Sequence, residues 1–322
     1  MNAPACRVCG GVEGNTVYVA RERMYGTGDE FEYVRCGTCG CQQIVTVPAD
    51  LGKYYPADYY SYAPTSMPGL RRAVTGLRNR SYFGRWRTIT PGKLVAAALP
   101  HASLAAVAKV KPRRDARILD VGCGYGELLM ELRSMGFTRL TGVDPYTAAT
   151  VEYDDGLVIR KISLAELLGE KFDVVMMHHV FEHMPDPLAT LRTVAGLLAD
   201  GGVCIIRIPV AHSWASRRYG PLWVQHDAPR HLFLHTEESM RRAAVQAQLA
   251  IADVVYDSSE VQIWGSELYR RDISLLSVPR GVYGNPLRRL LSPTFVRYRA
   301  KTRRLNRQKQ GDQAAFYLRP MR

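Results

Sequence analysis

Three glycines at alternate positions, Gly122, Gly124 and Gly126, follow a short apolar stretch at residues 118–121. Such a turn lets the backbone approach a ligand where a Cβ atom would collide. A helix that starts after the turn points its first N–H groups at that ligand. The next apolar stretch ends in Asp144, whose carboxylate is placed to accept hydrogen bonds from the two hydroxyls of a ribose. These residues predict a nucleotide site, with a spacing that differs from the G-x-G-x-x-G of dinucleotide enzymes.

Three stretches in this order resemble the class I S-adenosylmethionine-dependent methyltransferases. They are D-V-G-C-G-Y-G at 120–126, V-D-P at 143–145 and F-D-V-V-M-M-H-H-V-F-E-H at 172–183. The resemblance implies that Asp120 and the glycine turn hold the methionine part of the cofactor, and that Asp144 holds its ribose. The cofactor contacts that it implies are Asp120, Gly122, Cys123, Gly124, Tyr125, Gly126, Asp144, Pro145, Ser163, His178 and His179.

The order of apolar and helical stretches around these residues predicts an α/β fold with a Rossmann-like, seven-stranded methyltransferase sheet. Strands alternate with helices, so we expect a mostly parallel sheet with helices on both faces and ligands at the carboxyl ends of the strands. The expected strands are residues 117–121, 140–143, 157–161, 172–177, 203–208, 251–256 and 314–318.

Three parts of the chain are expected. Residues 1–50 form a zinc-ribbon domain, and residues 51–112 a tyrosine-rich and basic helical linker or cap, in which Pro100 breaks a helix. Residues 113–322 form the methyltransferase domain, with a basic helical insertion at about 265–312.

Two C-x-x-C pairs near the N-terminus indicate the zinc ribbon. Cys6 and Cys9 form the first pair and Cys36 and Cys39 the second, and a glycine follows each pair so that backbone N–H groups can face the sulfurs. Four thiolates brought together make the closed arrangement of structural zinc sites, so the predicted ion is not catalytic. Cys41 could replace one ligand, and a redox dithiol or unrelated thiols are the alternatives.

Methyl transfer needs a nucleophile in line with the sulfonium methyl group and a base for its proton. Glu182 and His183 follow the fourth strand, and His183 is the first choice of base because an imidazole titrates near neutral pH. His231 is the second candidate base. Asp227 and Arg230 are candidate substrate ligands, with Arg230 suited to a phosphate. The alternatives are a structural Asp227–Arg230 ion pair and an E-H pair that caps a helix. A metal at these histidines is disfavoured because they lack i, i+4 spacing on a helix.

Two aromatic segments are candidates for the acceptor site. Residues 53–62 hold five tyrosines, of which Tyr59 and Tyr60 are candidate substrate contacts, since rings stack and hydroxyls form hydrogen bonds. The alternative is a packed connector. Residues 212–236 combine histidines, tryptophans and charged groups, which predicts a loop-like acceptor pocket rather than a core element.

A fuller resemblance is to bacterial methyltransferases with a C-x-x-C front end, an E-H pair, a D-x-P-R-H-L segment and an L-N-x-x-x-x-G-D-Q ending, here residues 305–313. It implies a sugar, nucleotide-sugar or glycan-precursor acceptor. O-methylation is favoured over C-methylation because the long C-terminal domain of the sugar C-methyltransferases is missing. A nucleic-acid (RNA) methyltransferase and a catalytically inactive cofactor-binding module are the alternatives, and the intact glycines and acids argue against the latter.

The net charge of +13 is concentrated at one end, because residues 267–322 hold 14 basic side chains against 3 acidic ones. Such a segment attracts nucleic acid or an anionic membrane surface, and a solvated helix surface is the alternative. No apolar run reaches the roughly 18–20 residues of a membrane helix, and no signal-peptide pattern opens the chain. Seven cysteines outside any disulfide-like array are typical of a reducing compartment. We therefore expect a cytoplasmic protein and leave its oligomeric state open.

Overall fold

A mixed sheet forms the centre of the molecule. The computed structural model describes residues 3–55, 69–84, 90–153, 157–167, 169–277 and 292–321. Within them the central sheet has the strand order β11-β12-β9-β8-β4-β5-β7-β6. The strands are β4 (Arg117–Val121), β5 (Arg139–Val143), β6 (Val151–Glu152), β7 (Leu157–Arg160), β8 (Phe172–His178), β9 (Leu198–Pro209), β11 (Leu249–Tyr256) and β12 (Gln313–Pro320).

The middle of this sheet is parallel and its edges are antiparallel. Strands β7, β5, β4, β8 and β9 run parallel to one another, whereas β12 lies antiparallel between β9 and β11. Each of the seven predicted strands is present close to its predicted position. The eighth, β6, pairs antiparallel with the edge strand β7 and was not predicted, because two residues are too few to show a period.

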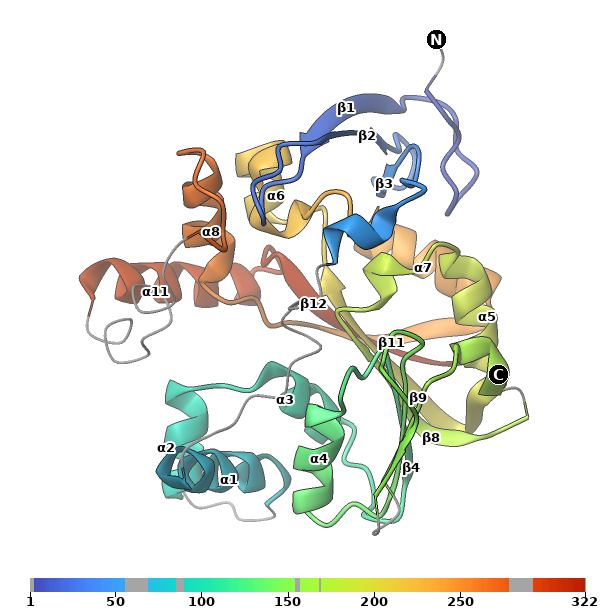
Figure 1. The fold of residues 1–322 in the computed structure, drawn as a ribbon, viewed down its shortest axis with the longest axis vertical. Helices are drawn as coiled ribbons and strands as arrows, with labels where there is room; N and C mark the ends of the chain where they lie inside the picture. The colour runs from blue at the N-terminus through green and yellow to red at the C-terminus, as the bar shows by residue number, and fades with distance from the viewer. Residues whose placement is uncertain are drawn as a thin grey trace.

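Helices cover both faces of the sheet, which explains the continuous apolar run of β8. Along this strand Val174 and Met176 lie in one hydrophobic cluster and Val175 and Met177 in another. A strand between two helical layers has no polar face. The first cluster includes α3 (Ala102–Lys109) and α4 (Glu127–Ser134), and the second includes α5 (Pro187–Leu197) and α7 (Glu237–Gln246) (Figure 1).

The remaining helices lie outside these two layers. Helices α1 (Gly69–Phe83) and α2 (Pro91–Ala98) pack on each other beside α3. The predicted break near Pro100 is present between α2 and α3. Helices α6 (Trp214–Tyr219), α8 (Val261–Tyr269) and α11 (Pro293–Arg307) follow later in the chain. Among the described residues, no helix combines the length and the apolar character needed to cross a membrane.

A second sheet lies at the N-terminal end of the molecule (Figure 1). It consists of β1 (Thr16–Arg21), β2 (Glu30–Arg35), β3 (Gln42–Ile44) and β10 (Phe233–Leu234), in that order. Strand β10 pairs with β3, although it comes from the stretch that the sequence assigned to the methyltransferase domain. The N-terminal ribbon is therefore joined to the rest of the fold by backbone hydrogen bonds.

The segment around β10 corrects the prediction of a loop-like acceptor pocket at residues 212–236. Trp223, Phe233 and His235 are fully buried, and the Trp223 Nε1–H donates to Asp312 Oδ2 at 3.0 Å. These aromatic and polar side chains find their partners in distant parts of the chain. The segment is a core element, and its strand β10 pairs with β3 of the N-terminal sheet.

Arg230 is the charged centre of this junction. Its guanidinium is completely buried and donates to Glu22 Oε1 at 2.8 Å and to Asp227 Oδ1 at 2.6 Å. A third bond, of 3.2 Å, reaches the carbonyl oxygen of Tyr54. Glu22 precedes β2, so this network ties the N-terminal sheet to the segment that follows β9.

Replacing Arg230 by glutamine should destabilise the protein by about 3–5 kcal/mol, because Glu22 and Asp227 would keep their charges in a buried site without a counter-charge. The measurement is the free energy of unfolding by chemical denaturation. The matched control is Arg21→Gln, which removes an exposed ion pair with Glu30 and should change little. Equal effects of the two substitutions would contradict this role of Arg230.

Candidate functional site

The glycine loop lies at the carboxyl end of β4, where the fold requires small residues. The N–H of Gly122 donates to the carbonyl oxygen of Val143 at 2.7 Å. Its φ is +68°, and a Cβ atom there would lie 2.5 Å from a methyl carbon of Val180. Gly126, with φ +85°, is the N-cap of α4. A side chain at either position would push the loop away from the strand ends.

Asp144, at the end of the neighbouring strand, forms a hydrogen bond with this loop. It follows β5 directly, and its Oδ2 accepts from the Gly124 N–H at 3.0 Å. Its Oδ1 accepts from the Tyr146 N–H at 2.9 Å. The carboxylate is buried and lies between the glycine loop and the next turn, where the sequence places the ribose.

Asp120 makes the site favourable for a cation. Burial first, and then the negative charge of Asp144, raise the pKa of Asp120 to about 8. A positive group nearby would restore the ionised form. The ammonium or sulfonium of S-adenosylmethionine has this charge, so the residues present fit that cofactor.

The other predicted cofactor contacts come from the segments that follow β4, β5, β7 and β8. Ser163 donates from its N–H and its hydroxyl to Glu166 Oε2, at 2.7 and 2.8 Å. Burial lowers the pKa of His178, and neither of its ring nitrogens has a hydrogen-bond partner within the described residues. The contacts of Cys123, Tyr125, Pro145, Ser163, His178 and His179 with a cofactor stay predictions.

His179 belongs to a charged network that sequence reasoning missed. Arg207 Nη1 lies 2.7 Å from His179 Nε2, and Arg207 Nε donates to Asp257 Oδ2 at 2.7 Å. A guanidinium can only donate, so the neutral His179 ring carries its proton on Nδ1, which lies 3.4 Å from Glu182 Oε1. Arg207 interrupts the apolar run of β9. This charge in a buried strand was the signal in the sequence that could have revealed the network.

Glu182, His183 and His231 come together at the end of β8. The first two lie in the short 3₁₀ helix η4 (Phe181–His183), and His231 comes from the segment before β10. One carboxylate oxygen and one nitrogen of each ring lie within 4.8 Å of one another. The structure thus brings together all three predicted catalytic residues.

Electrostatics keep this cluster ready to accept a proton. Burial, followed by the charge of His231, lowers the pKa of His183, so its imidazole is neutral at neutral pH. Burial alone would raise the pKa of Glu182, but the approach of His179, whose Nδ1 lies 3.4 Å from Oε1, and the charges of the nearby histidines bring this pKa to about 2. A neutral imidazole beside an ionised carboxylate is the arrangement of a general base.

Arg230 and Asp227 correct the prediction of a phosphate-binding pair. The guanidinium of Arg230 is buried and its donors go to Glu22, Asp227 and Tyr54. The two residues form the structural ion pair that was the alternative interpretation. The other two candidate substrate contacts, Tyr59 and Tyr60, lie outside the described residues.

The four predicted zinc ligands converge in the N-terminal ribbon. The Sγ atoms of Cys6, Cys9, Cys36 and Cys39 lie within 4.8 Å of one another. The N–H groups of Thr38 and Cys39 point at Cys36 Sγ, at 3.3 and 3.4 Å. This donor set and these backbone bonds fit a tetrahedral Zn²⁺ ion. The fifth thiol, Cys41, is outside the cluster.

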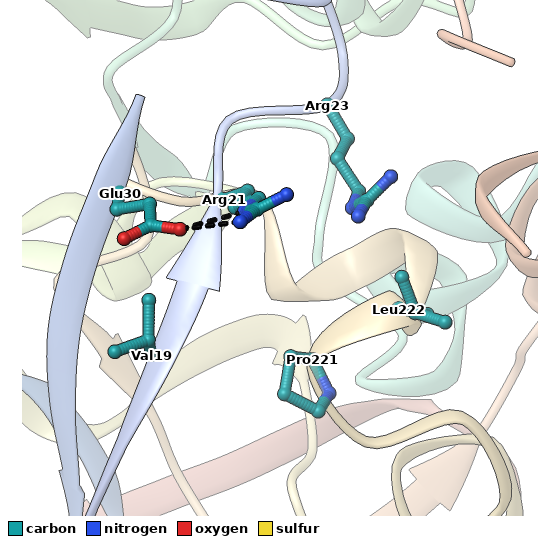
Figure 2. A pocket seen from close by; sticks show the side chains of 6 residues that line it. All are labelled: Val19, Arg21, Arg23, Glu30, Pro221 and Leu222. Carbon is teal, nitrogen blue, oxygen red and sulfur yellow. Dashed lines mark hydrogen bonds and ion pairs between the residues drawn. The ribbon is translucent and has the colours of Figure 1, made fainter. Parts of the chain in front are cut away.

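One pocket lies on the ribbon side of the molecule, away from the glycine loop. Figure 2 shows Val19, Arg21, Arg23 and Glu30 on one side of it and Pro221 and Leu222 on the other. Its volume is about 260 Å³. Arg21 is already paired with Glu30, and none of the predicted catalytic or cofactor residues lines the pocket.

The chain matches a model of the methyltransferase domain family over residues 93–254. This stretch is half of the chain and contains the glycine loop, Asp144 and the Glu182–His183–His231 cluster, so the chain belongs to this methyltransferase family. The family and the residues of the site favour S-adenosylmethionine as the methyl donor.

Curated relatives match a shorter part of the chain. The ubiquinone biosynthesis O-methyltransferase of Caulobacter sp. (strain K31) is 43% identical over 105 residues, which are 30% of this chain and 41% of the relative. The protein of the same name from Parvibaculum lavamentivorans is 35% identical over 118 residues, or 33% of this chain and 47% of the relative. The matched stretch thus spans less than half the length of these relatives.

Solved structures resemble the chain more distantly. The 1,6-didemethyltoxoflavin-N1-methyltransferase of Burkholderia thailandensis, solved with S-adenosylhomocysteine, has a TM-score of 0.41 and 18% identity, and the likeness covers 81% of this chain and 93% of that one. A putative methyltransferase complexed with the Haloferax volcanii Trm112 activator has a TM-score of 0.46 and 16% identity, with 80% and 100% covered.

Replacing Asp144 by alanine should weaken the binding of S-adenosylmethionine by about 1–3 kcal/mol, because the ribose hydroxyls would lose their buried acceptor. Isothermal titration calorimetry measures this loss. Asp115→Ala is the control, since Asp115 is exposed and paired with Arg113, and it should bind normally. Unchanged affinity in the Asp144 variant would refute the ribose contact.

Proposed function

We propose that this protein transfers a methyl group from S-adenosylmethionine to a hydroxyl oxygen of a small-molecule acceptor. The observation that carries the proposal is the cluster of Glu182, His183 and His231 beside the glycine loop. Val180, which packs against Gly122, is two residues from Glu182. A proton acceptor therefore stands next to the place where the methyl group is presented.

The reaction needs one proton transfer and one displacement. His183 takes the proton of the acceptor hydroxyl, and the oxygen then attacks the methyl carbon. The carbon–sulfur bond breaks and its electron pair stays on sulfur, which leaves S-adenosylhomocysteine. The Nδ1–H of His183 donates to the carbonyl oxygen of Arg230 at 2.8 Å, so the neutral ring offers Nε2 to the proton.

Two acceptor classes have support. The E-H pair, the D-x-P-R-H-L segment and the cysteine pairs favour a sugar, nucleotide-sugar or glycan-precursor hydroxyl, which we keep as the first candidate. The curated relatives are named for ubiquinone biosynthesis, which favours a phenolic hydroxyl as the second. The basic helix α11 would suit an RNA acceptor or contact with an anionic membrane, and RNA therefore belongs in the test.

The test is transfer of labelled methyl from S-adenosylmethionine to a panel of nucleotide sugars, glycans, phenols and RNA. We expect label on a hydroxyl of one small-molecule class. The turnover of the His183→Asn variant should fall by about 10²–10⁴-fold, which is the usual contribution of a general base. The variant should still bind the cofactor. His101→Gln, a change in a histidine that pairs with Glu131, is the control. Label on RNA alone would overturn the proposal. Full turnover of the His183 variant would overturn the assignment of the base.

We further propose that the four converging cysteines hold a structural zinc ion. Cys36→Ser should remove one zinc equivalent per chain and lower the thermal midpoint, because binding of the ion contributes directly to folding. Cys41→Ser changes a neighbouring thiol outside the cluster and should keep the zinc. Metal analysis of the dialysed proteins decides between them, and equal zinc in both variants would argue against this site.

A further inference from the structure

The cluster at the end of β8 has the geometry of a second metal site. Glu182, His183 and His231 are each present with one potential ligand atom, and these atoms lie within 4.8 Å of one another. Two imidazoles and one carboxylate are a common set of three protein ligands for zinc and for other divalent transition metals. The remaining coordination positions would be open to water or substrate.

Both histidines are oriented as metal ligands usually are. His183 Nδ1 lies 2.8 Å from the carbonyl oxygen of Arg230, and His231 Nδ1 lies 2.8 Å from that of Gln225. A carbonyl oxygen can only accept, so each Nδ1 carries a proton and each neutral ring has its lone pair on Nε2. Most metal-binding histidines donate the other ring N–H to a carboxylate, a backbone carbonyl or water, which fixes the tautomer in this way.

Glu182 supplies an independent observation. Its side chain is completely buried, yet neither carboxylate oxygen has a hydrogen-bond partner within the described residues. The approaches to Oε1 that the structure records come from His179 at 3.4 Å and His231 at 3.9 Å. A buried carboxylate without hydrogen bonds is costly, and a bound cation would remove that cost.

The charge around the cluster also calls for a cation. Glu22 and Asp227 share the single guanidinium of Arg230, and Glu182 is a third buried carboxylate, which lies beside His179 and His231. The neighbouring Arg207 is neutralised by Asp257. Two negative charges are therefore left over, and one divalent ion would balance them.

We infer that Glu182, His183 and His231 bind one divalent transition-metal ion. Two nitrogen ligands disfavour Mg²⁺ and Ca²⁺, which prefer oxygen. Asp227 is not among the ligands, because its carboxylate is held by Arg230. The site is separate from the four cysteines of the N-terminal ribbon.

The inference gives the proposed function a different way to ionise its acceptor, and this consequence rests on that function. A hydroxyl bound to the ion would release its proton to water at a lower pH than a free one, and the oxygen would then attack the methyl carbon as before. His183 would be a ligand in the metal-bound enzyme, so its role as base belongs to the metal-free protein.

The test is a titration with Co²⁺ of the full chain. The protein keeps zinc in its cysteine cluster during the titration. We expect one further equivalent to bind, with the d–d absorption of nitrogen and oxygen ligands and without thiolate charge-transfer bands. Excess Mg²⁺ should not displace it. Glu182→Gln and His183→Asn should each lose this equivalent, while His101→Gln keeps it.

Folding of the variants is checked by the binding of S-adenosylmethionine, which does not use these side chains in our assignment. Co²⁺ that binds equally to the Glu182 variant and the wild-type chain, or that shows only thiolate bands, would overturn the inference. No acceptor is needed, so a failure here differs from a failure of the methyl-transfer assay.

Discussion

The pairing of the buried Arg230 guanidinium with Glu22 and Asp227 is the constraint on which the rest of the site depends. A charge in the interior must be compensated, and here the compensation comes from two distant parts of the chain. The side chain of Arg230 thereby holds the N-terminal sheet, while its carbonyl oxygen accepts from His183 Nδ1. One residue thus fixes both the position of the ribbon and the tautomer of the candidate base.

The sequence predicted the strands and the glycine loop of the candidate site well, for a physical reason. Strands buried between two helical layers are mostly apolar, and a loop that approaches a cofactor closely favours glycine. Both constraints act over fewer than ten residues, so β4, β5, β8 and the loop at Gly122 can be recognised locally. The cysteine pairs could be recognised in the same way, because their residue type and the spacing within each pair are local features of the sequence.

The segment at residues 212–236 was harder to predict because its contacts are long-range. Residues 212–236 are polar and aromatic, which is typical of an exposed binding loop, yet Trp223 finds Asp312 and Arg230 finds Glu22. Nothing in the local pattern distinguishes a polar residue with a buried partner from one in solvent. Arg207 is the exception, since a charge within the apolar run of β9 shows that a buried partner must exist.

The difference between local and long-range contacts also limits what the relatives say about the substrate. The family match covers residues 93–254, which include the glycine loop and Asp144, the residues that we expect to hold the cofactor. The surroundings of His183 also draw on residues outside that match, because Tyr55 lies 3.1 Å from His183 Nδ1 and Glu22 holds the neighbouring arginine. The part of the chain that surrounds His183 therefore includes the N-terminal ribbon and its junction. Specificity for the acceptor can differ from that of the curated relatives even where the donor site is the same.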